Sequence, residues 1–451
     1  LVEYLTFQNY FTDRTLLDGV RVVEPGTIVA LSEGRETPEV RRYWDYAFVE
    51  PDQHASEADL VDELDRLFTQ AVGRQLVSDV PVGAYLSGGI DSGSITAIAA
   101  QQLPLMSTFT VGFDLNSASG IELAYDERES AEHMSYLFRT QQYEMVLKAG
   151  DMERAMRQLV WHIEEPRVGQ SYPNYYAARL ASRFAKVVLA GTGGDELFGG
   201  YPWRYYRGAV ASSFDEYTAR YYEFWQRLVP GEDMQALLGP LGSDAASIDT
   251  RQIFRDVFQE HAPSLTRPED YINHSMYFEA KTFLHGLLVV DDKLSMAHSL
   301  ETRVPFLDND LVDFAMNLPA AMKLDNLQNV VQMNENEPGK VRQYFARTKD
   351  GKLLLRKAMA RHVPASVSER EKQGFSGPDA SWFRGESIDY VRDLLMSPRA
   401  RIYDLLDRPT VTRLVNDHLE GRQNRRLLIW SLLSLENWLD IFAHGRWEAM
   451  A

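Results

Sequence analysis

Six consecutive residues, Ser87–Ser92 (SGGIDS), combine two glycines, two hydroxyls and one carboxylate. They follow a short apolar run, Val82–Leu86, and precede a stretch that reads as a helix. An anion binds well where a parallel strand ends and a helix begins, because the exposed N–H groups of the helix point at it. The glycines Gly88 and Gly89 would let a phosphate approach the backbone, Ser87 and Ser92 would add hydroxyl donors, and Asp91 would hold a bridging Mg2+. The segment therefore predicts a phosphate site, with a capped turn as the alternative.

A second glycine-rich segment, Gly191–Tyr201 (GTGGDELFGGY), follows the β-rich run Ala185–Ala190. Its glycines predict a tight backbone near a charged ligand, and Asp195 could supply a second metal ligand beside Asp91. A flexible surface loop is the alternative, although the apolar pair Leu197 and Phe198 argues against simple solvation. The chain contains no GxxxxGK[ST] sequence, so transfer of a γ-phosphate is a weaker expectation than chemistry that releases pyrophosphate.

Two later segments carry charged residues beside apolar ones. The first, Ser299–Asp308 (SLETRVPFLD), has a mainly structural interpretation, in which Arg303 pairs with Glu301 or Asp308. In the second, Glu371–Ser376 (EKQGFS), Lys372 stands two residues before a glycine. A compact ammonium suits a pyrophosphate leaving group. A solvated lysine is the better interpretation in isolation, but the two glycine loops favour a catalytic role.

The elements that must position these residues alternate between strands and helices in the first half of the chain. This order predicts a parallel sheet covered by helices on both faces. After about Tyr201 the strand signals stop, and the remainder is expected to be mostly helical, with a long surface loop or lid over Asn326–Asp350. The expected helices are 55–77, 95–103 and 129–139, and the expected strands are 82–86, 107–113, 143–146 and 185–190.

Composition limits the possible functions. The 451 residues are 45% hydrophobic, enough for two or three domains with a large core. A net charge of -18 excludes a protein that binds nucleic acid through general electrostatic attraction. It also means that binding of ATP would need local cations and backbone donors. The absence of cysteine excludes disulfides and thiolate zinc sites and makes a reducing cytoplasm the expected setting. No signal peptide or membrane-spanning run is expected.

The motifs together resemble the synthetase half of the glutamine-dependent asparagine synthetase family, whose relatives include β-lactam and carbapenam synthetases. The resemblance covers most of the chain and rests on many segments in the same order. These are 87–92 (SGGIDS), 109–113 (FTVGF), 125–127 (YDE), 193–201 (GGDELFGGY), 301–308 (ETRVPFLD) and 372–375 (KQGF). Residues 1–50 resemble the tail of the glutaminase (Ntn-type) domain that precedes this half, which leaves 51–451 as the synthetase domain. Because the chain starts at Leu1 with residues typical of the middle of a domain, we interpret it as a fragment or a processed form.

The resemblance implies a parallel-sheet α/β fold of the ATP-pyrophosphatase (adenine nucleotide alpha hydrolase-like) type with a largely helical C-terminal extension. It implies a carbon-nitrogen ligase that adenylates a carboxylate, aspartate before others, with release of pyrophosphate, and transfers the acyl group to ammonia. ATP and Mg2+ are the implied cofactors. The implied residue roles are the following. Adenine lies near Leu86 and Val111, and Mg2+ is bound by Asp91 and Asp195. The nucleotide is bound by Ser87, Gly88, Gly89, Ser92, Gly191, Gly193 and Gly194. The catalytic residues are Lys372, Thr192, Glu301 and Arg303.

Two departures from the family bear on the reaction. Family glutaminase domains use a cysteine nucleophile, and this chain has no cysteine, so ammonia must come from elsewhere. At the position of Thr192, asparagine synthetases carry a glutamate and β-lactam synthetases a tyrosine used in base chemistry. Thr192 offers neither a charge nor a usable pKa. Adenylation is therefore expected, while the acid remains open between aspartate and another substrate, such as a sugar acid or a natural-product precursor.

Other function classes fit the sequence less well. A nucleotide-binding subunit without catalysis is disfavoured because Asp91, Asp195 and Lys372 are all retained. A tRNA-thiolating enzyme is disfavoured by the missing cysteines and the acidic charge. The expected partners are a carboxylic acid and glutamine-derived ammonia, with no nucleic acid and no membrane, and a homodimer is an assembly open to the chain.

Overall fold

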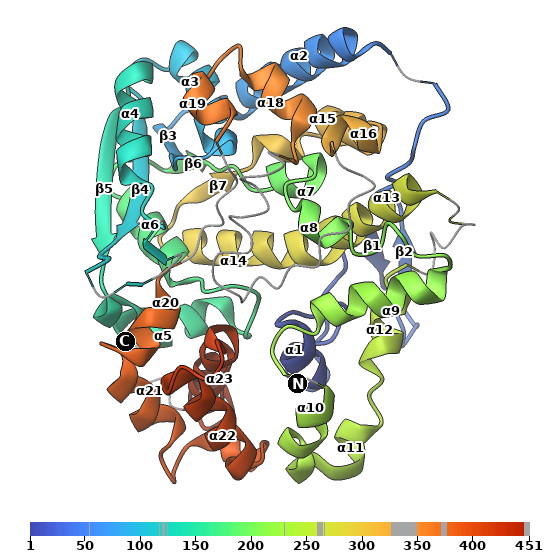
Figure 1. Ribbon diagram of the computed structural model, residues 1–451, viewed down its shortest axis with the longest axis vertical. Coiled ribbons are helices and arrows are strands. Elements are labelled where there is room, and N and C mark those ends of the chain that lie inside the picture. The colour runs from blue at the N-terminus through green and yellow to red at the C-terminus, as the bar shows by residue number, and fades with distance from the viewer. Residues whose placement is uncertain are drawn as a thin grey trace.

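The centre of the protein is a sheet of five parallel strands in the order β5-β4-β3-β6-β7. The computed structural model describes residues 1–53, 55–116, 118–119, 122–123, 125–229, 231–258, 265, 267–325, 350–370 and 377–445. The strands are β3 (Val82–Tyr85), β4 (Ser107–Phe113), β5 (Gln141–Leu147), β6 (Val187–Leu189) and β7 (Glu301–Arg303). Figure 1 shows β5 and β4 at the left edge of the molecule and β3, β6 and β7 nearer its middle, with helices around them.

Helices cover both faces of the sheet, as the alternation of strands and helices predicts. On one face, α3 (Ile90–Gln102) and α4 (Arg128–Phe138) follow β3 and β4 and pack on them. On the other, α6 (Tyr172–Ala181) and α14 (His285–Met296) pack against β4, β5 and β7. Successive residues of β6 show the two faces, because Val188 is buried with α6 residues and Leu189 is buried with α3 residues.

The first long helix, α2 (Glu57–Gln75), illustrates how local sequence sets an element. Ser56 caps it, since its hydroxyl accepts a hydrogen bond from the N–H of Asp59. Leu64, Phe68 and Val72 recur at helical spacing and are fully buried. The helix predicted over 55–77 is therefore confirmed. It packs against α3, the helix that follows β3 and its loop.

Most other predicted elements also have the expected type. The strand predicted over 107–113 is β4, the strand 143–146 lies within β5, and the helix 129–139 is α4. The helix expected from Ile95 begins at Ile90 instead, with Gly89 as its N-cap. The prediction that strands stop after Tyr201 was wrong, because Glu301–Arg303 forms the edge strand β7 beside β6. A three-residue strand is too short to show a periodic pattern.

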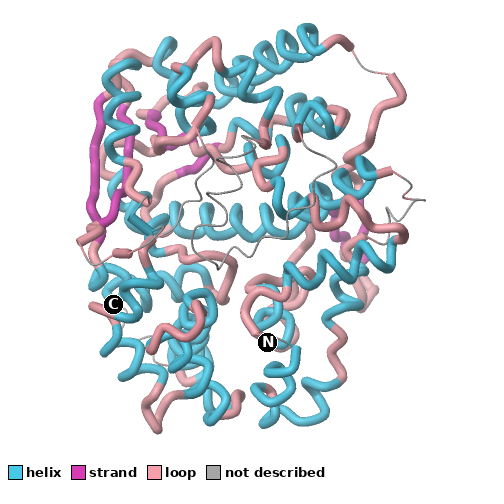
Figure 2. The backbone as a smooth tube through the Cα atoms, in the orientation of Figure 1, coloured by secondary structure: helices cyan, strands magenta, loops and turns pink. Residues whose placement is uncertain are grey.

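The remainder is mostly helical, as Figure 2 shows. Before α14 the further helices are α1 (Val2–Phe7), α5 (Ala149–Ile163), α7 (Gly194–Phe198), α8 (Pro202–Tyr205), α9 (Phe214–Trp225), α10 (Gly231–Leu237), α11 (Gly242–Ala246), α12 (Thr250–Asp256), α13 (Pro268–Phe278) and a π-helix (Glu279–Leu284). After it come α15 (Asn309–Met316), α16 (Ala320–Lys323), α18 (Leu353–Met359), α19 (Ala365–Ser368), α20 (Asp379–Arg384), α21 (Ile388–Leu395), α22 (Arg408–Leu419), α23 (Arg426–Trp438) and a π-helix (Leu439–Ala443). Within the described ranges, no helix has the length and apolar character needed to cross a bilayer.

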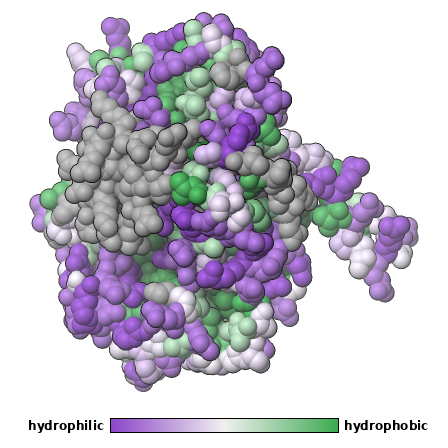
Figure 3. Space-filling view, turned by 45° about the vertical axis from the view of Figure 1, so that its right-hand side comes forward, coloured by the Kyte–Doolittle hydropathy of each residue, from purple (hydrophilic) through white to green (hydrophobic). Residues whose placement is uncertain are grey.

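The first fifty residues divide into a buried and an exposed part. Helix α1 is buried, with Tyr4, Leu5 and Phe7 fully inaccessible to solvent. The antiparallel pair β1 (Thr27–Ala30) and β2 (Glu39–Arg42) is mainly exposed, and Leu31 and Val40 are 69% and 63% accessible. Hydrophilic side chains predominate over the face drawn in Figure 3, which fits the net charge of -18. The N-terminal segment is thus anchored in the main core by one helix and leaves apolar residues of its hairpin uncovered.

Candidate active site

The SGGIDS segment links the carboxyl end of β3 to the first turn of α3. Its two hydroxyls lie 2.9 Å apart, because the Oγ of Ser87 and the Oγ of Ser92 share a hydrogen bond. The N–H of Ser87 donates to the Oγ of Ser92 at 3.0 Å, and the N–H of Gly89 donates to the Oγ of Ser87 at 3.2 Å. These bonds hold the loop in a closed turn that places Asp91 in the first turn of α3.

The second glycine-rich loop lies directly against the first. A Cβ at Gly194 would come within 2.6 Å of Oδ1 of Asp91, and a Cβ at Gly191 within 3.0 Å of the Cβ of Asp91. Gly193 has a positive φ of 99°, which favours glycine. The loop passes so close to Asp91 that side chains at Gly191 and Gly194 would collide with it. The two loops that carry Asp91 and Asp195 are therefore neighbours, and the prediction that both carboxylates bind a metal stays a prediction.

Lys352, which the sequence did not single out, joins the two carboxylates. Its Nζ lies 2.7 and 2.5 Å from the two oxygens of Asp91 and 2.7 Å from Oδ1 of Asp195. Its side chain is 2% exposed, whereas those of Asp91 and Asp195 are 16% and 12% exposed. A cation thus already bridges the two carboxylates that the sequence assigned to Mg2+.

Two arginines surround the same position. Nη1 of Arg370 donates to the carbonyl of Gly88 at 2.9 Å, and a Cβ at Gly88 would lie 1.8 Å from that nitrogen. Arg356 lies one turn after Lys352 on α18, and its Nη1 donates to the carbonyls of Ser368 and Arg370. Burial lowers the pKa of Arg356, while the nearby charges of Asp91 and Asp195 raise it in part. The two loops therefore lie among positive groups, although the chain as a whole is strongly negative.

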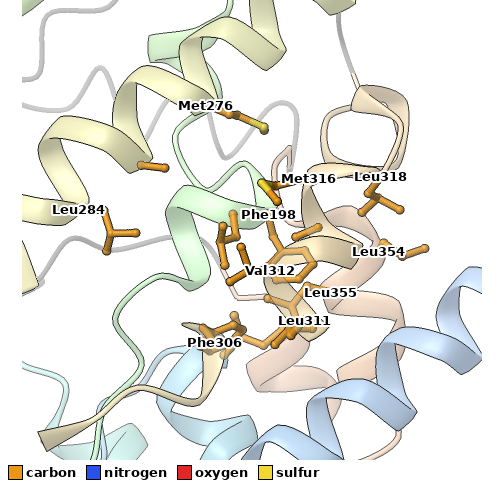
Figure 4. Packing of buried hydrophobic residues seen from close by; sticks show 14 of the residues in the cluster. Phe198, Met276, Leu284, Phe306, Leu311, Val312, Met316, Leu318, Leu354 and Leu355 are labelled. Atoms are coloured by element: carbon orange, nitrogen blue, oxygen red, sulfur yellow. The ribbon is translucent and has the colours of Figure 1, made fainter. Parts of the chain in front are cut away.

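A buried apolar cluster fixes the loops and Lys352 relative to one another. Figure 4 shows Phe198, the last residue of α7, near Phe306 and Leu355, with Leu354 farther to the right in the same cluster. The carbonyl of Phe198 also accepts the N–H of Lys352 at 3.1 Å. Since Leu354 and Leu355 follow Lys352 on α18 and are about fully buried, the cluster holds the lysine in place. This burial supports the prediction that Leu197 and Phe198 are not loop surface.

The glycine pair after α7 serves the position of Asp195. A Cβ at Gly200 would lie 1.9 Å from Oδ1 of Asp195, and the N–H of Gly200 donates to the carbonyl of Asp195 at 2.7 Å. Any larger side chain at Gly200 would therefore displace the carboxylate. Glycine is required at position 200 because a side chain there would collide with the carboxylate of Asp195, a candidate metal ligand, and not because of the backbone conformation.

Glu301 and Arg303 lie at the edge of the sheet and contact each other. Nε of Arg303 donates to Oε1 of Glu301 at 2.7 Å, and Nη1 donates to the carbonyls of Gln75 and Val77 at the end of α2. Arg303 thus caps helix α2, a structural task that its residue type suits. These contacts support the structural interpretation of this segment and give no support to the catalytic one. Asp308, the other expected partner, pairs with Arg74 instead.

The remaining predicted residues are placed only in part. Leu86 directly follows β3, and Val111 lies on the adjacent strand β4. The N–H of Leu86 donates to the carbonyl of Phe109, and the side chains of Leu86 and Val111 are buried. Lys372, with Gly374 and Phe375, lies outside the described residues. The loop predicted over 326–350 also lies outside them, except for Asp350. Their roles remain predictions from the sequence.

Thr192 faces a second carboxylate, which the sequence did not reveal. Its Oγ1 donates to Oδ2 of Asp291 on α14 at 2.8 Å, and Nδ2 of Asn174 on α6 donates to Oδ1 at 2.7 Å. Burial raises the pKa of Asp291, and these two hydrogen bonds lower it in part. Neither Asp291 nor Lys352 belongs to a motif that sequence alone would mark. The one local signal for Lys352 is its place after Gly351, directly before a helix.

Asp91 and Asp195 fit a Mg2+ that also binds phosphate oxygens. Within the described part of the chain no group of three or more acidic or histidine side chains could hold a metal alone. Mg2+ at nucleotide sites commonly takes only one or two carboxylates, with phosphates and water completing its shell. Two carboxylates on adjacent loops, with serine hydroxyls and three cationic side chains around them, suit a polyphosphate with its metal.

Comparison with known proteins places this geometry in a family. The family model for asparagine synthase matches residues 63–440. The asparagine synthetase (glutamine-hydrolyzing) 1 of Bacillus subtilis is 29% identical over 99% of this chain and 69% of its own length. The amidase chyE of Penicillium rubens is 25% identical over 87% of this chain and 64% of its own length. The chain thus spans about two thirds of these relatives.

Solved structures with a resemblance are smaller proteins. The NH3-dependent NAD synthetase of Campylobacter jejuni matches 48% of this chain over 100% of its own, at 13% identity and a TM-score of 0.21. The NMN synthetase of Francisella tularensis matches 50% of this chain and 95% of its own, at 14% identity and a TM-score of 0.23. Because these TM-scores are low, the description of the fold rests on the parallel sheet of this chain.

Proposed function

Because the chain belongs to the asparagine synthase family, we propose that it adenylates a carboxylic acid with ATP, releases pyrophosphate and transfers the acyl group to ammonia. The products would be AMP, pyrophosphate and a primary amide. The proposal deepens what the family supports, which is an ATP-dependent ligase that forms a C–N bond.

The observation that carries the proposal is the convergence of the two glycine loops on Lys352. Asp91 and Asp195 come from the carboxyl ends of adjacent strands, β3 and β6, and share that one buried cation. Ligands of open parallel α/β sheets bind at this edge. Serine hydroxyls, helix N–H groups and cations at one place suit an anion with several charged oxygens.

Each group would have a definite task in adenylation. Ser87 and Ser92 would donate to the pyrophosphate oxygens, and Lys352 with Arg370 would offset the charge that builds up as pyrophosphate leaves the α-phosphorus. Mg2+ bound by Asp91 and Asp195 would neutralise the phosphates and act as a Lewis acid. Lys372 remains the sequence-based candidate for stabilising the oxyanion of the acyl transfer step. Leu86 and Val111 remain the candidates for contact with adenine.

Aspartate is the first acid to test, because the family is named for its amide. Thr192 is the reason to test other acids as well, since it replaces the charged or phenolic side chain expected there. A sugar acid or a natural-product precursor is the alternative substrate. The 25% identity to a fungal amidase is compatible with such variety.

Ammonia would come from glutamine through a glutaminase domain. We propose that residues 1–50 are the tail of that domain and that 51–451 form the synthetase domain. The exposed apolar residues of the β1–β2 hairpin, with Tyr43 at 67% and Val23 at 61%, support this assignment because they lack a cover in the described structure.

An ATP–pyrophosphate exchange assay would test the proposal. The chain is incubated with ATP, Mg2+ and radiolabelled pyrophosphate, together with aspartate or each acid of a carboxylate panel. At least one acid should stimulate the return of label into ATP. Absence of exchange with every acid, in a protein that binds ATP, would contradict the proposed adenylation.

A further inference from the structure

Asp291 is held at the active-site loop by two neutral donors from distant parts of the chain. Thr192 of the glycine loop binds Oδ2 at 2.8 Å, and Asn174 of α6 binds Oδ1 at 2.7 Å. Both oxygens therefore have a fixed direction. Three elements that come together only in the fold, the β6–α7 loop, α6 and α14, meet at this carboxylate.

The carboxylate has no counter-ion among the described residues. Asp91 and Asp195 share Lys352, but the two partners of Asp291 are a hydroxyl and an amide, both uncharged. The charge of Asp291 also raises the pKa of Tyr85, which burial raises most. A partly buried carboxylate is costly to keep charged when no cation lies near it. The site therefore favours a positively charged ligand.

The glycine loop places this carboxylate close to the reacting centre. Gly191 and Gly194 contact Asp91, and Thr192 between them contacts Asp291. Asp91, a candidate ligand of the phosphate-bound metal, and Asp291 therefore both lie against the segment 191–194. An acyl group joined to the α-phosphate would have to lie near this loop, within reach of a small nucleophile beside Thr192.

We propose that Asp291, positioned by Thr192 and Asn174, binds the nitrogen substrate as ammonium and removes the proton that prevents its attack. This rests on the proposed function. Ammonium is the main form of ammonia at neutral pH and has no lone pair. It is also a small cation, of the kind that a carboxylate with only uncharged partners among the described residues can bind.

The step balances as follows. Ammonium gives one proton to the carboxylate of Asp291 and becomes ammonia. The nitrogen lone pair forms the C–N bond with the acyl carbon, and the bond from that carbon to the oxygen of AMP breaks, so that AMP leaves with the electron pair. The nitrogen then loses a second proton to solvent and becomes the neutral amide. Asp291 returns its proton to solvent before the next turnover.

Asp291→Asn tests this role, with hydroxylamine as the second nucleophile. The variant keeps the shape and can keep a hydrogen bond from Thr192, but it can neither attract ammonium nor accept a proton. Hydroxylamine is largely neutral at neutral pH and needs no deprotonation before it attacks. The matched control is Asp292→Asn, which removes a charge from the exposed neighbour on the same helix.

With ammonium chloride, amide formation by Asp291→Asn should fall about 10²-fold or more, the range of a general base. With hydroxylamine, hydroxamate formation should fall much less, and the residual amide formation should rise with pH as free ammonia accumulates. Asp292→Asn should match the wild type. Equal losses with both nucleophiles, or unchanged amide formation, would overturn the proposal.

The acid-driven ATP–pyrophosphate exchange separates this inference from the proposed function. Exchange should persist in Asp291→Asn with the acid that supports it in the wild type. Loss of exchange only in the variant would assign Asp291 to binding of the acid and overturn its role toward ammonium. Absence of exchange in the wild type would instead contradict the proposed function.

Discussion

Replacing Lys352 by methionine should destabilise the protein unless a divalent cation is supplied. The substitution keeps the length and apolar stem of the side chain but leaves Asp91 and Asp195 facing each other without the ammonium between them. Removal of one partner from a buried ion pair typically costs about 3–5 kcal/mol. Since both carboxylates keep slight exposure, at 16% and 12%, we expect the lower end, about 3 kcal/mol.

Urea unfolding of the wild type and the variant, with and without Mg2+, measures this effect. Mg2+ should stabilise Lys352→Met more than the wild type, because the ammonium of Lys352 no longer lies between the two carboxylates. The control is Lys357→Met on the same helix, whose lysine is 53% exposed and pairs with a half-exposed Glu57. Such exposed pairs are worth about 0–1 kcal/mol.

Three results would refute this reasoning. One is a loss of unfolding free energy no greater for Lys352→Met than for Lys357→Met. Another is an equal loss of unfolding free energy in Lys352→Met and in the double variant that combines it with Asp91→Asn. Removing one of the two repelling charges should recover stability. The third is equal stabilisation of both proteins by Mg2+.

Four further predictions concern catalysis. Asp91→Asn and Asp195→Asn should each lower turnover of Mg-ATP by about 10–100-fold or more while circular dichroism remains native, and full activity in both would place the metal elsewhere. Gly200→Ala should lower the same rate, because its methyl carbon would lie 1.9 Å from Oδ1 of Asp195 and displace that carboxylate. If the rate of Gly200→Ala depended on Mg2+ concentration as the wild-type rate does, this prediction would be contradicted. Lys372→Ala should lower kcat about 10²–10³-fold in pyrophosphate release, with incomplete rescue by arginine, and near-normal kcat would leave a surface lysine. Ammonium salts and not glutamine should support amide formation by this chain, since it has no cysteine; glutamine-driven turnover without a partner would show otherwise.

The sequence predicted those parts of the site that are continuous in the chain. SGGIDS and GTGGDELFGGY each follow a strand within a few residues, so the strand signal and the glycines together indicated which edge of the sheet they share. The observed contact between Gly194 and Asp91 follows from β3 and β6 being neighbours. Strand alternation sufficed for the parallel sheet, except for β7, which is defined only by its partner β6.

What the sequence did not predict depends on contacts between distant residues. Lys352 and Asp91 are 261 positions apart, and Thr192 and Asp291 are 99 positions apart. When only the neighbouring sequence is considered, a lysine at the start of a helix and an aspartate within a helix are interpreted as ordinary surface residues. The contacts of Arg303 with the end of α2 were missed for the same reason, because they join residues 226 and 228 positions apart. The catalytic role of Arg303 stays a prediction.

Identification of the nucleotide product tests the central claim most directly. Purified protein is incubated with ATP, Mg2+, ammonium chloride and the acid that drives pyrophosphate exchange, and the nucleotides are separated by ion-exchange chromatography. AMP and pyrophosphate should form in amounts equal to the amide. Formation of ADP and phosphate in those amounts would contradict it, because the loops around Lys352 would then serve transfer of the γ-phosphate.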